Sequence, residues 1–371
     1  MKTPVILTND DQTRVLIIGV QTPENRLIDT AAYFAEFRQL VESSGIPITQ
    51  EYYVKLRTID NAYFFTKGKL DEILALCAEY KIDDVIVSEP LMAHQERNLS
   101  KLLDARVFDR TELILDIFER GAQSAEGKLQ VEVAKLRHRK SRLAGKGIHL
   151  SQQTGRIGTR GPGETQKERE LQHIEHHMIK LQKDLEQLEK VRTQQRKRRV
   201  SRQIPHISII GYTNAGKSSI LNLLTKSTVL AENRLFATLD TTTRELVVNG
   251  VKKGTISDTV GFIQNLPHHL IEAFKSTLAD LEFADLLLHV VDISNPNWQH
   301  QIKVVFEILS ELGVEDKPML FVFNKVDLLS DEKRTKVLGL IDPYRPYVVV
   351  SAQSKDEIKP LIEALEQWKS K

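Results

Sequence analysis

The sequence contains a single cysteine, Cys77, so no disulfide bond can form within the chain. It also lacks an apolar run of about 18 residues, the length that a membrane-spanning helix needs. The first ten residues lack the apolar stretch of a secretion signal. We therefore expect a cytoplasmic protein with no membrane span. The formal net charge of +2 is too small to indicate a partner by itself.

The composition is that of an ordinary globular protein, with 41% hydrophobic and 27% charged residues among 371. This length suggests two or three domains. Residues 1–115 alternate strand-like and helix-like patterns, which predicts a small parallel α/β domain. The pattern of residues 116–202 is helical. Residues 203–371 alternate strands and helices again, which predicts a doubly wound sheet.

The helical region has the pattern of two long paired helices. Apolar residues recur at spacings of three and four over residues 171–188, as in the seam of a coiled coil. A similar stripe covers residues 129–143, and residues 145–163 between them are rich in glycine and short polar residues. We therefore expect an antiparallel helical hairpin with a glycine-rich tip.

Basic residues are concentrated in this hairpin. From Val133 to Gly163 there are eight Lys and Arg residues and no Asp or Glu, and from Lys190 to Arg202 there are seven more, again without an acid. Such segregation favours binding of a polyanion. Solvated helix faces and a flexible linker are the alternative explanation.

A strand-like run, Ile207–Ile210, leads directly into a Gly-x-x-x-x-Gly-Lys-Ser loop at Gly211–Ser218. Glycines let the backbone curl so that its N–H groups point at phosphate oxygens. Lys217 is expected to reach the β- and γ-phosphates, and the Ser218 hydroxyl to ligate Mg²⁺. The helix that follows directs its positive end at the same anion.

Three further motifs follow predicted strands. Asp258 is expected to hold Mg²⁺ through water, and the amide of Gly261 to meet the γ-phosphate. The Asp327 carboxylate can accept hydrogen bonds from both guanine donors, which adenine does not offer. Asn324 and Lys325 precede it, and Ser351–Gln353 would complete the base pocket. Together these motifs predict a GTPase.

A switch loop is expected at residues 235–244, with Thr238 as the Mg²⁺ ligand and Thr241, Thr242 and Thr243 as alternatives. Phe262 stands where many GTPases have a water-orienting Gln, so intrinsic hydrolysis should be slow and need outside help. Asn214 is a candidate K⁺ ligand or a residue that braces the loop.

The predicted site has a catalytic and a binding set. The catalytic residues are Lys217, Thr238 and Gly261. The GTP-binding residues are Gly211, Tyr212, Thr213, Asn214, Ala215, Gly216, Lys217, Ser218, Phe236, Ala237, Thr238, Leu239, Asp240, Asp258, Thr259, Val260, Gly261, Asn324, Lys325, Val326, Asp327, Ser351, Ala352 and Gln353.

Several stretches spread over nearly the whole chain resemble the HflX family of translational GTPases. They are Gln95–Leu99, Phe108–Thr111, Leu115–Phe118, Glu126–Gln130, Gly161–Gln166, Phe236–Asp240 and Asp258–Ile263. The resemblance implies a monomeric Mg²⁺-dependent GTPase that binds the large ribosomal subunit and splits stalled or stressed 70S ribosomes, which stimulate its hydrolysis. It also implies ATP binding by the N-terminal domain. The basic residues expected to contact ribosomal RNA are Arg137, Arg139, Lys140, Arg142, Lys146, Arg156 and Arg160.

The sequence departs from the family pattern at Thr66, where glycine is usual, and at Thr241, where proline is frequent. It stops about 20 residues after Ser351, so the small C-terminal domain of many members is expected to be absent.

Three alternatives stay open: an assembly GTPase acting on immature large subunits, an ATP-dependent RNA-remodelling enzyme, and a binding module in which GTP hydrolysis is only a timer.

Overall fold

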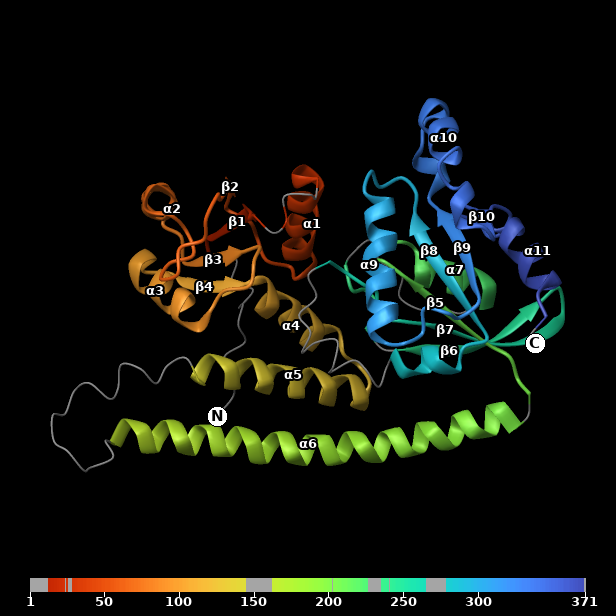
Figure 1. The fold of residues 1–371 in the computed structure, drawn as a ribbon, viewed down its shortest axis with the longest axis horizontal. Coiled ribbons are helices and arrows are strands. Elements are labelled where there is room, and N and C mark those ends of the chain that lie inside the picture. Colours follow the sequence, from red (N-terminus) through yellow and green to blue (C-terminus); the bar gives the residue numbers. More distant parts are fainter. Residues whose placement is uncertain are drawn as a thin grey trace. The chain divides into compact units, whose positions relative to one another are not determined.

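The computed structural model describes residues 13–23, 25, 29–144, 162–201, 203–225, 235–239, 241–264 and 278–369. The chain divides into two compact units (Figure 1). The first unit combines Met1–Arg120 with Leu129–Leu185, and the second combines Gly121–Lys128 with Glu186–Lys371. The expected boundary between residues 115 and 116 falls inside one continuous helix, α4 (Arg110–Gly121).

The first unit contains a parallel four-stranded sheet in the order β2-β1-β3-β4. Apolar side chains of its strands pack on one face against α2 and α3, while Phe34 of α1 lies over Gly19 on the other. The elements are β1 (Val15–Gln21), α1 (Thr30–Ser43), β2 (Gln50–Lys55), α2 (Lys67–Tyr80), β3 (Asp84–Val87), α3 (Ala93–Leu103) and β4 (Arg106–Asp109).

Two long helices, α5 (Ala125–Ala144) and α6 (Pro162–Ser201), form the expected antiparallel pair (Figure 1). Within the first unit, Arg139 and Lys140 of α5 form ion pairs with Glu170 and Glu175 of α6, at 2.6 and 2.7 Å. The stripe on α6 faces inward, because its members Ile174 and Leu181 are buried. The tip, residues 145–161, lies outside the described residues.

The second unit is built on a six-stranded sheet in the order β10-β9-β8-β5-β7-β6. All strands are parallel except the edge strand β6, which pairs antiparallel with β7. Its strands are β5 (His206–Gly211), β6 (Thr242–Val248), β7 (Val251–Asp258), β8 (Leu286–Asp292), β9 (Met319–Asn324) and β10 (Tyr347–Val349).

Helices cover both faces of this sheet. The buried side chains of α7 (Lys217–Thr225) and α11 (Lys359–Gln367) pack on one face. The buried side chains of α9 (Trp298–Glu311) pack on the other face, together with the partly buried Val337 and Leu338 of α10 (Asp331–Leu338). Short 3₁₀ turns occupy Ala279–Phe283, Val326–Leu328 and Asp342–Tyr344. In such a sheet the carboxyl ends of the parallel strands meet at one edge, where ligands bind.

No helix among the described residues combines the length and the apolar character that a membrane crossing requires.

Candidate nucleotide-binding site

The phosphate loop of the second unit can be built only with glycine at two positions. Gly211, at the end of β5, has a φ of +146°, and a Cβ there would lie 2.2 Å from the Val290 carbonyl oxygen. Gly216 has a φ of +95°, and its Cβ would lie 2.2 Å from the Asn324 side-chain nitrogen. Backbone therefore lies where any side chain would clash, which is the geometry of a phosphate cradle.

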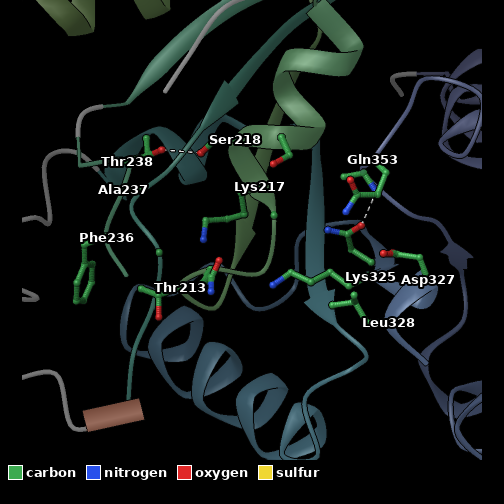
Figure 2. A pocket seen from close by; sticks show the side chains of 16 residues that line it. Thr213, Lys217, Ser218, Phe236, Ala237, Thr238, Lys325, Asp327, Leu328 and Gln353 are labelled. Carbon is green, nitrogen blue, oxygen red and sulfur yellow. Dashed lines mark hydrogen bonds between the residues drawn. The ribbon is translucent and has the colours of Figure 1, made fainter. Parts of the chain in front are cut away.

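A cavity of about 340 Å³ opens above this loop (Figure 2). Most of the predicted site residues line it: Thr213, Asn214, Gly216, Lys217, Ser218, Phe236, Ala237, Thr238, Gly261, Asn324, Lys325, Asp327, Ala352 and Gln353. Two residues that the sequence reasoning missed also line it, Ser219 and Leu328. Ser219 directly follows the phosphate-loop motif and Leu328 directly follows Asp327. Their position beside predicted site residues was thus the only sequence signal that they would line the cavity.

Other predicted residues do not line the cavity: Gly211, Tyr212, Ala215, Leu239, Asp258, Thr259, Val260, Val326 and Ser351. Some of them make hydrogen bonds next to it. Thr259, for example, donates a hydrogen bond from its hydroxyl to the carbonyl of Ile209 in β5, at 2.8 Å. The Tyr212 hydroxyl accepts one from the Gln264 amide at 2.9 Å. Asp240 lies outside the described residues.

Lys217 is buried, with 6% of its surface exposed, and donates a hydrogen bond to the Tyr212 carbonyl at 2.7 Å. Burial lowers the pKa of its ammonium group to about 8; the nearby Asp258 raises it and the like charge of Lys325 lowers it further. A buried ammonium group is stabilised by an anion placed beside it. The side chain is thus suited to hold a phosphate.

Three oxygen-bearing side chains meet next to Lys217. The Ser218 hydroxyl lies 2.6 Å from the Thr238 hydroxyl and donates a hydrogen bond to Asp258 Oδ2, also at 2.6 Å. Burial raises the pKa of Asp258, while Lys217 and the hydrogen bonds from Ser218 and Thr238 lower it. Asp258 Oδ1 is buried without a hydrogen-bond partner among the described residues.

This oxygen set fits Mg²⁺, a hard cation that is usually held by one or two protein ligands together with phosphate oxygens and water. Within the described part of the chain, no group of three His, Cys, Asp or Glu residues could hold a metal ion. Phosphate oxygens and water would therefore complete the coordination of Mg²⁺ here. None of the alternatives to Thr238 lines the cavity. Thr242 and Thr243 belong to β6, opposite Asp258 and Ser257 of β7, and Thr241 does not line the cavity.

Gly261 and Phe262 connect the end of β7 to the phosphate loop. The Thr213 amide donates to the Phe262 carbonyl at 2.7 Å, and the Phe262 amide donates to the Gly211 carbonyl at 3.1 Å. The Phe262 side chain is 2% exposed and does not line the cavity. It is therefore a core residue that offers no group to orient a water molecule.

The opposite end of the cavity is held together by Asn324. Its side-chain nitrogen donates to the Ala215 carbonyl at 2.9 Å, and its side-chain oxygen accepts from the Ala352 amide at 2.9 Å. One side chain thereby joins the phosphate loop to the loop after β10. Figure 2 shows Lys217 and Lys325 extending into the cavity, with Ser218 and Thr238 at one end and Asp327 and Gln353 at the other.

Lys325 forms an ion pair with Asp292, which ends β8, at 2.8 Å. The sequence reasoning did not identify Asp292 as a site residue. A signal was available, because Asp292 ends an apolar strand, as Asp258 ends β7.

The basic residues assigned to RNA differ in their surroundings. Arg139 and Lys140 are about half exposed and form ion pairs across the hairpin. Arg137 is partly buried on the same helix, and Lys146, Arg156 and Arg160 lie outside the described residues.

Arg142 corrects the expectation of an RNA contact. Its side chain is only 12% exposed and forms ion pairs with Asp109 at 2.6 Å and Glu96 at 2.8 Å. It also donates to the Leu91 carbonyl at 2.7 Å. A guanidinium group that is buried between two carboxylates serves the packing of α5 within the first unit, because exposing it would leave both carboxylates unpaired.

Comparisons with known proteins identify related GTPases. Three family models match the chain: GTP-binding GTPase N-terminal over residues 31–119, GTP-binding GTPase Middle Region over 121–199, and 50S ribosome-binding GTPase over 206–325. The structure is similar to the crystal structure of an SsGBP and GDP complex, with a TM-score of 0.52 and 24% identity, covering 96% of this chain and 98% of that chain. At this identity the likeness concerns the fold.

Curated relatives match most of the chain. The GTPase HflX of Caldanaerobacter subterraneus subsp. tengcongensis is 41% identical over 365 residues, which cover 97% of this chain and 81% of the relative. The GTPase HflX of Escherichia coli K12 is 42% identical over 331 residues, which cover 89% and 77% respectively. With the nucleotide cavity described above, these relationships place the chain in the HflX family of GTPases, and it is an enzyme that binds and hydrolyses GTP.

Proposed function

We propose that the protein binds the large ribosomal subunit in its GTP-bound state and splits stalled or stressed 70S ribosomes into subunits. One support is the family model over residues 206–325, which is described as a 50S ribosome-binding GTPase. A second support is the hairpin, whose basic segment suits the phosphates of ribosomal RNA.

The observation that carries the nucleotide dependence is the contact between Leu239 and Gly121. Leu239 directly follows Thr238, is buried, and lies 3.6 Å from the position of a Cβ on Gly121. Gly121–Lys128 belongs to the same compact unit as the cavity and includes the first turn of α5. A switch loop that moves with the γ-phosphate would therefore move against the base of the hairpin.

The base of the hairpin is itself tied together in this unit, because Arg192 of α6 forms an ion pair with Glu126 of α5 at 2.9 Å. The start of α5 and the C-terminal part of α6 are thus joined next to the switch loop. GTP binding would set the position of the hairpin through this point, and hydrolysis would release it.

At the cavity, Lys217 and the Gly261 amide would hold the γ-phosphate. Mg²⁺, held by Ser218 and Thr238 directly and by Asp258 through water, would neutralise the charge of the β- and γ-phosphates. Because the buried Phe262 supplies no polar group, we propose that intrinsic hydrolysis is slow and that the ribosome stimulates it.

Asn214 lines the cavity with a left-handed φ of +60°, and we propose it as a ligand for K⁺. Hydrolysis measured in KCl and in NaCl at equal ionic strength would test this role. A rate that is equal in both salts for the wild type, or K⁺ stimulation that survives in Asn214→Ala, would exclude Asn214 as the ligand.

Sedimentation of assembled ribosomes through sucrose gradients tests the proposal. Protein with GTP should convert 70S particles to subunits, and protein with GDP or ATP should not. The Asp327→Asn variant supplies a matched control, because an amide at this position should favour xanthine over guanine nucleotides. That variant should split ribosomes with XTP and not with GTP.

Two results would contradict the proposal. Free subunits that appear only with ATP would favour remodelling by the N-terminal domain. This is the weaker alternative, because Thr66 in that domain stands where the family usually has glycine. Binding to immature large subunits, without any effect on assembled ribosomes, would favour a role in assembly.

A further inference from the structure

Asp292 stands at the carboxyl end of β8, directly opposite Asn324 at the end of β9. Its two carboxylate oxygens have separate partners. Oδ1 accepts hydrogen bonds from the Ser294 amide at 3.0 Å and the Ser294 hydroxyl at 2.5 Å. Oδ2 lies 2.8 Å from Lys325 Nζ. Ser294 thus fixes the carboxylate so that its second oxygen faces the lysine.

Lys325 needs such a partner for two reasons. It has a φ of +63°, an uncommon conformation for a residue with a side chain, and its four-carbon chain has many rotamers to lose. It also places a positive charge in the same cavity as Lys217, and this charge contributes to the lowered pKa of Lys217. A carboxylate beside Lys325 balances this second charge.

Asp292 does not line the cavity, and its side chain is only 16% exposed. It can therefore act on a bound nucleotide only through Lys325, which does line the cavity. We propose that Asp292 is a positioning residue for nucleotide binding: it holds Lys325 extended across the cavity, where the side chain can lie along the guanine ring. This inference rests on the assignment of the cavity to a guanine nucleotide. Because GTP and GDP share the base, both should depend on Asp292 to the same extent.

The test is the affinity of Asp292→Asn for fluorescent GTP and GDP analogues. The amide keeps the shape of the side chain and can still accept from Ser294, but it loses the ion pair. We expect both affinities to fall about tenfold, the scale of one charge-assisted hydrogen bond. The ratio of the two affinities and kcat at saturating GTP should stay unchanged.

Asp342→Asn is the matched control. It removes a carboxylate from the exposed pair with Arg345 in the same unit, and should leave nucleotide affinity unchanged. If Asp292→Asn does not fold, Ser294→Ala replaces it, because this variant keeps the charge and removes one of the two bonds that orient it. It should weaken both nucleotides by about two- to threefold.

A double-mutant cycle with Lys325→Met separates positioning from a general structural role. In the Lys325→Met background, Asp292→Asn should cause no further loss of affinity. Equal losses in the two backgrounds, or unchanged affinity in the single Asp292→Asn variant, would overturn the inference. If Asp327→Asn also retained full GTP affinity, the cavity assignment would fail with it. Loss of GTP in Asp327→Asn alone would overturn only the role of Asp292.

Discussion

Gly261 lies directly against Lys217. A Cβ on Gly261 would come within 2.8 Å of Lys217 Nζ and 2.9 Å of the Thr213 Cα atom. No side chain fits between Gly261 and these two residues, so only glycine permits the lysine that is to hold a phosphate and the amide that is to meet it to come this close.

Gly261→Ala should therefore lower kcat for GTP hydrolysis. The added methyl group must displace Lys217 or the phosphate loop, and a shift of about 1 Å near reacting groups can lower a rate roughly 100-fold. Single-turnover hydrolysis would measure the effect. Gly68→Ala is a matched control, because a Cβ at Gly68 meets nothing within 4 Å. Full activity in Gly261→Ala would contradict this packing.

Asn324→Ala should weaken GTP and GDP equally. The change leaves the buried Ala215 carbonyl and the Ala352 amide without their partner, and each such loss costs about 1–3 kcal/mol. Equilibrium titration with both nucleotides would measure the losses, which should be at least about tenfold. A selective loss of GTP would instead place Asn324 at the γ-phosphate.

Leu239→Ala tests the proposed link between the switch and the hairpin. The side chain packs against Gly121 and does not line the cavity, so nucleotide affinity should stay within about twofold of the wild type. Binding to large subunits should lose its dependence on GTP over GDP, because the switch no longer presses on the base of the hairpin. Subunit cosedimentation with each nucleotide would measure this difference, and a retained GTP dependence would exclude the link.

Arg142→Met should destabilise the fold more than Arg139→Met. Removing Arg142 leaves two carboxylates without their buried partner and should lower the free energy of unfolding by about 3 kcal/mol. Removing Arg139 breaks a half-exposed pair and should lower it by less than about 1 kcal/mol. Urea unfolding measures both.

Ribosomal RNA binding should show the reverse order, with a weaker salt dependence only in the Arg139 variant. An Arg142 variant of unchanged stability but weaker RNA binding would restore the original expectation for this residue.

His289→Leu should make the protein more resistant to acid. The ring is 1% exposed, packs against Phe306 and Phe321, and has no partner for Nδ1 among the described residues. Burial, with a smaller contribution from the charge of Lys217, lowers the pKa of His289 to about 3.

The sign of the effect follows from the protons bound in each state. Between pH 6.5 and about 3 the unfolded chain takes up a proton that the fold excludes, so stability is lost as pH falls through this window. The loss is at most about 1.4 kcal/mol per pH unit. Urea unfolding at pH 7, 6 and 5 should give a smaller decline for His289→Leu, and parallel declines would contradict the prediction.

The sequence by itself determined the nucleotide chemistry and most of the second sheet. The phosphate loop at Gly211–Ser218 could be predicted from the sequence, because its function depends on a backbone geometry that consecutive residues set. Asp258 and Asp327 could be read in the same way, since each follows a strand at the edge where ligands bind. The hairpin also followed from local spacing, because a helix presents every third and fourth residue on one face.

Only the tertiary structure decided which partner each side chain has. Arg142 has the charge and position expected of an RNA contact, yet it pairs with Asp109, which lies 33 residues earlier in the chain. The sequence also did not predict that Lys325 pairs with Asp292 or that Leu239 packs on Gly121. Residues distant in sequence meet only where elements pack together, so the partners of buried charges and the contacts of the switch loop are properties of the packing and not of local pattern.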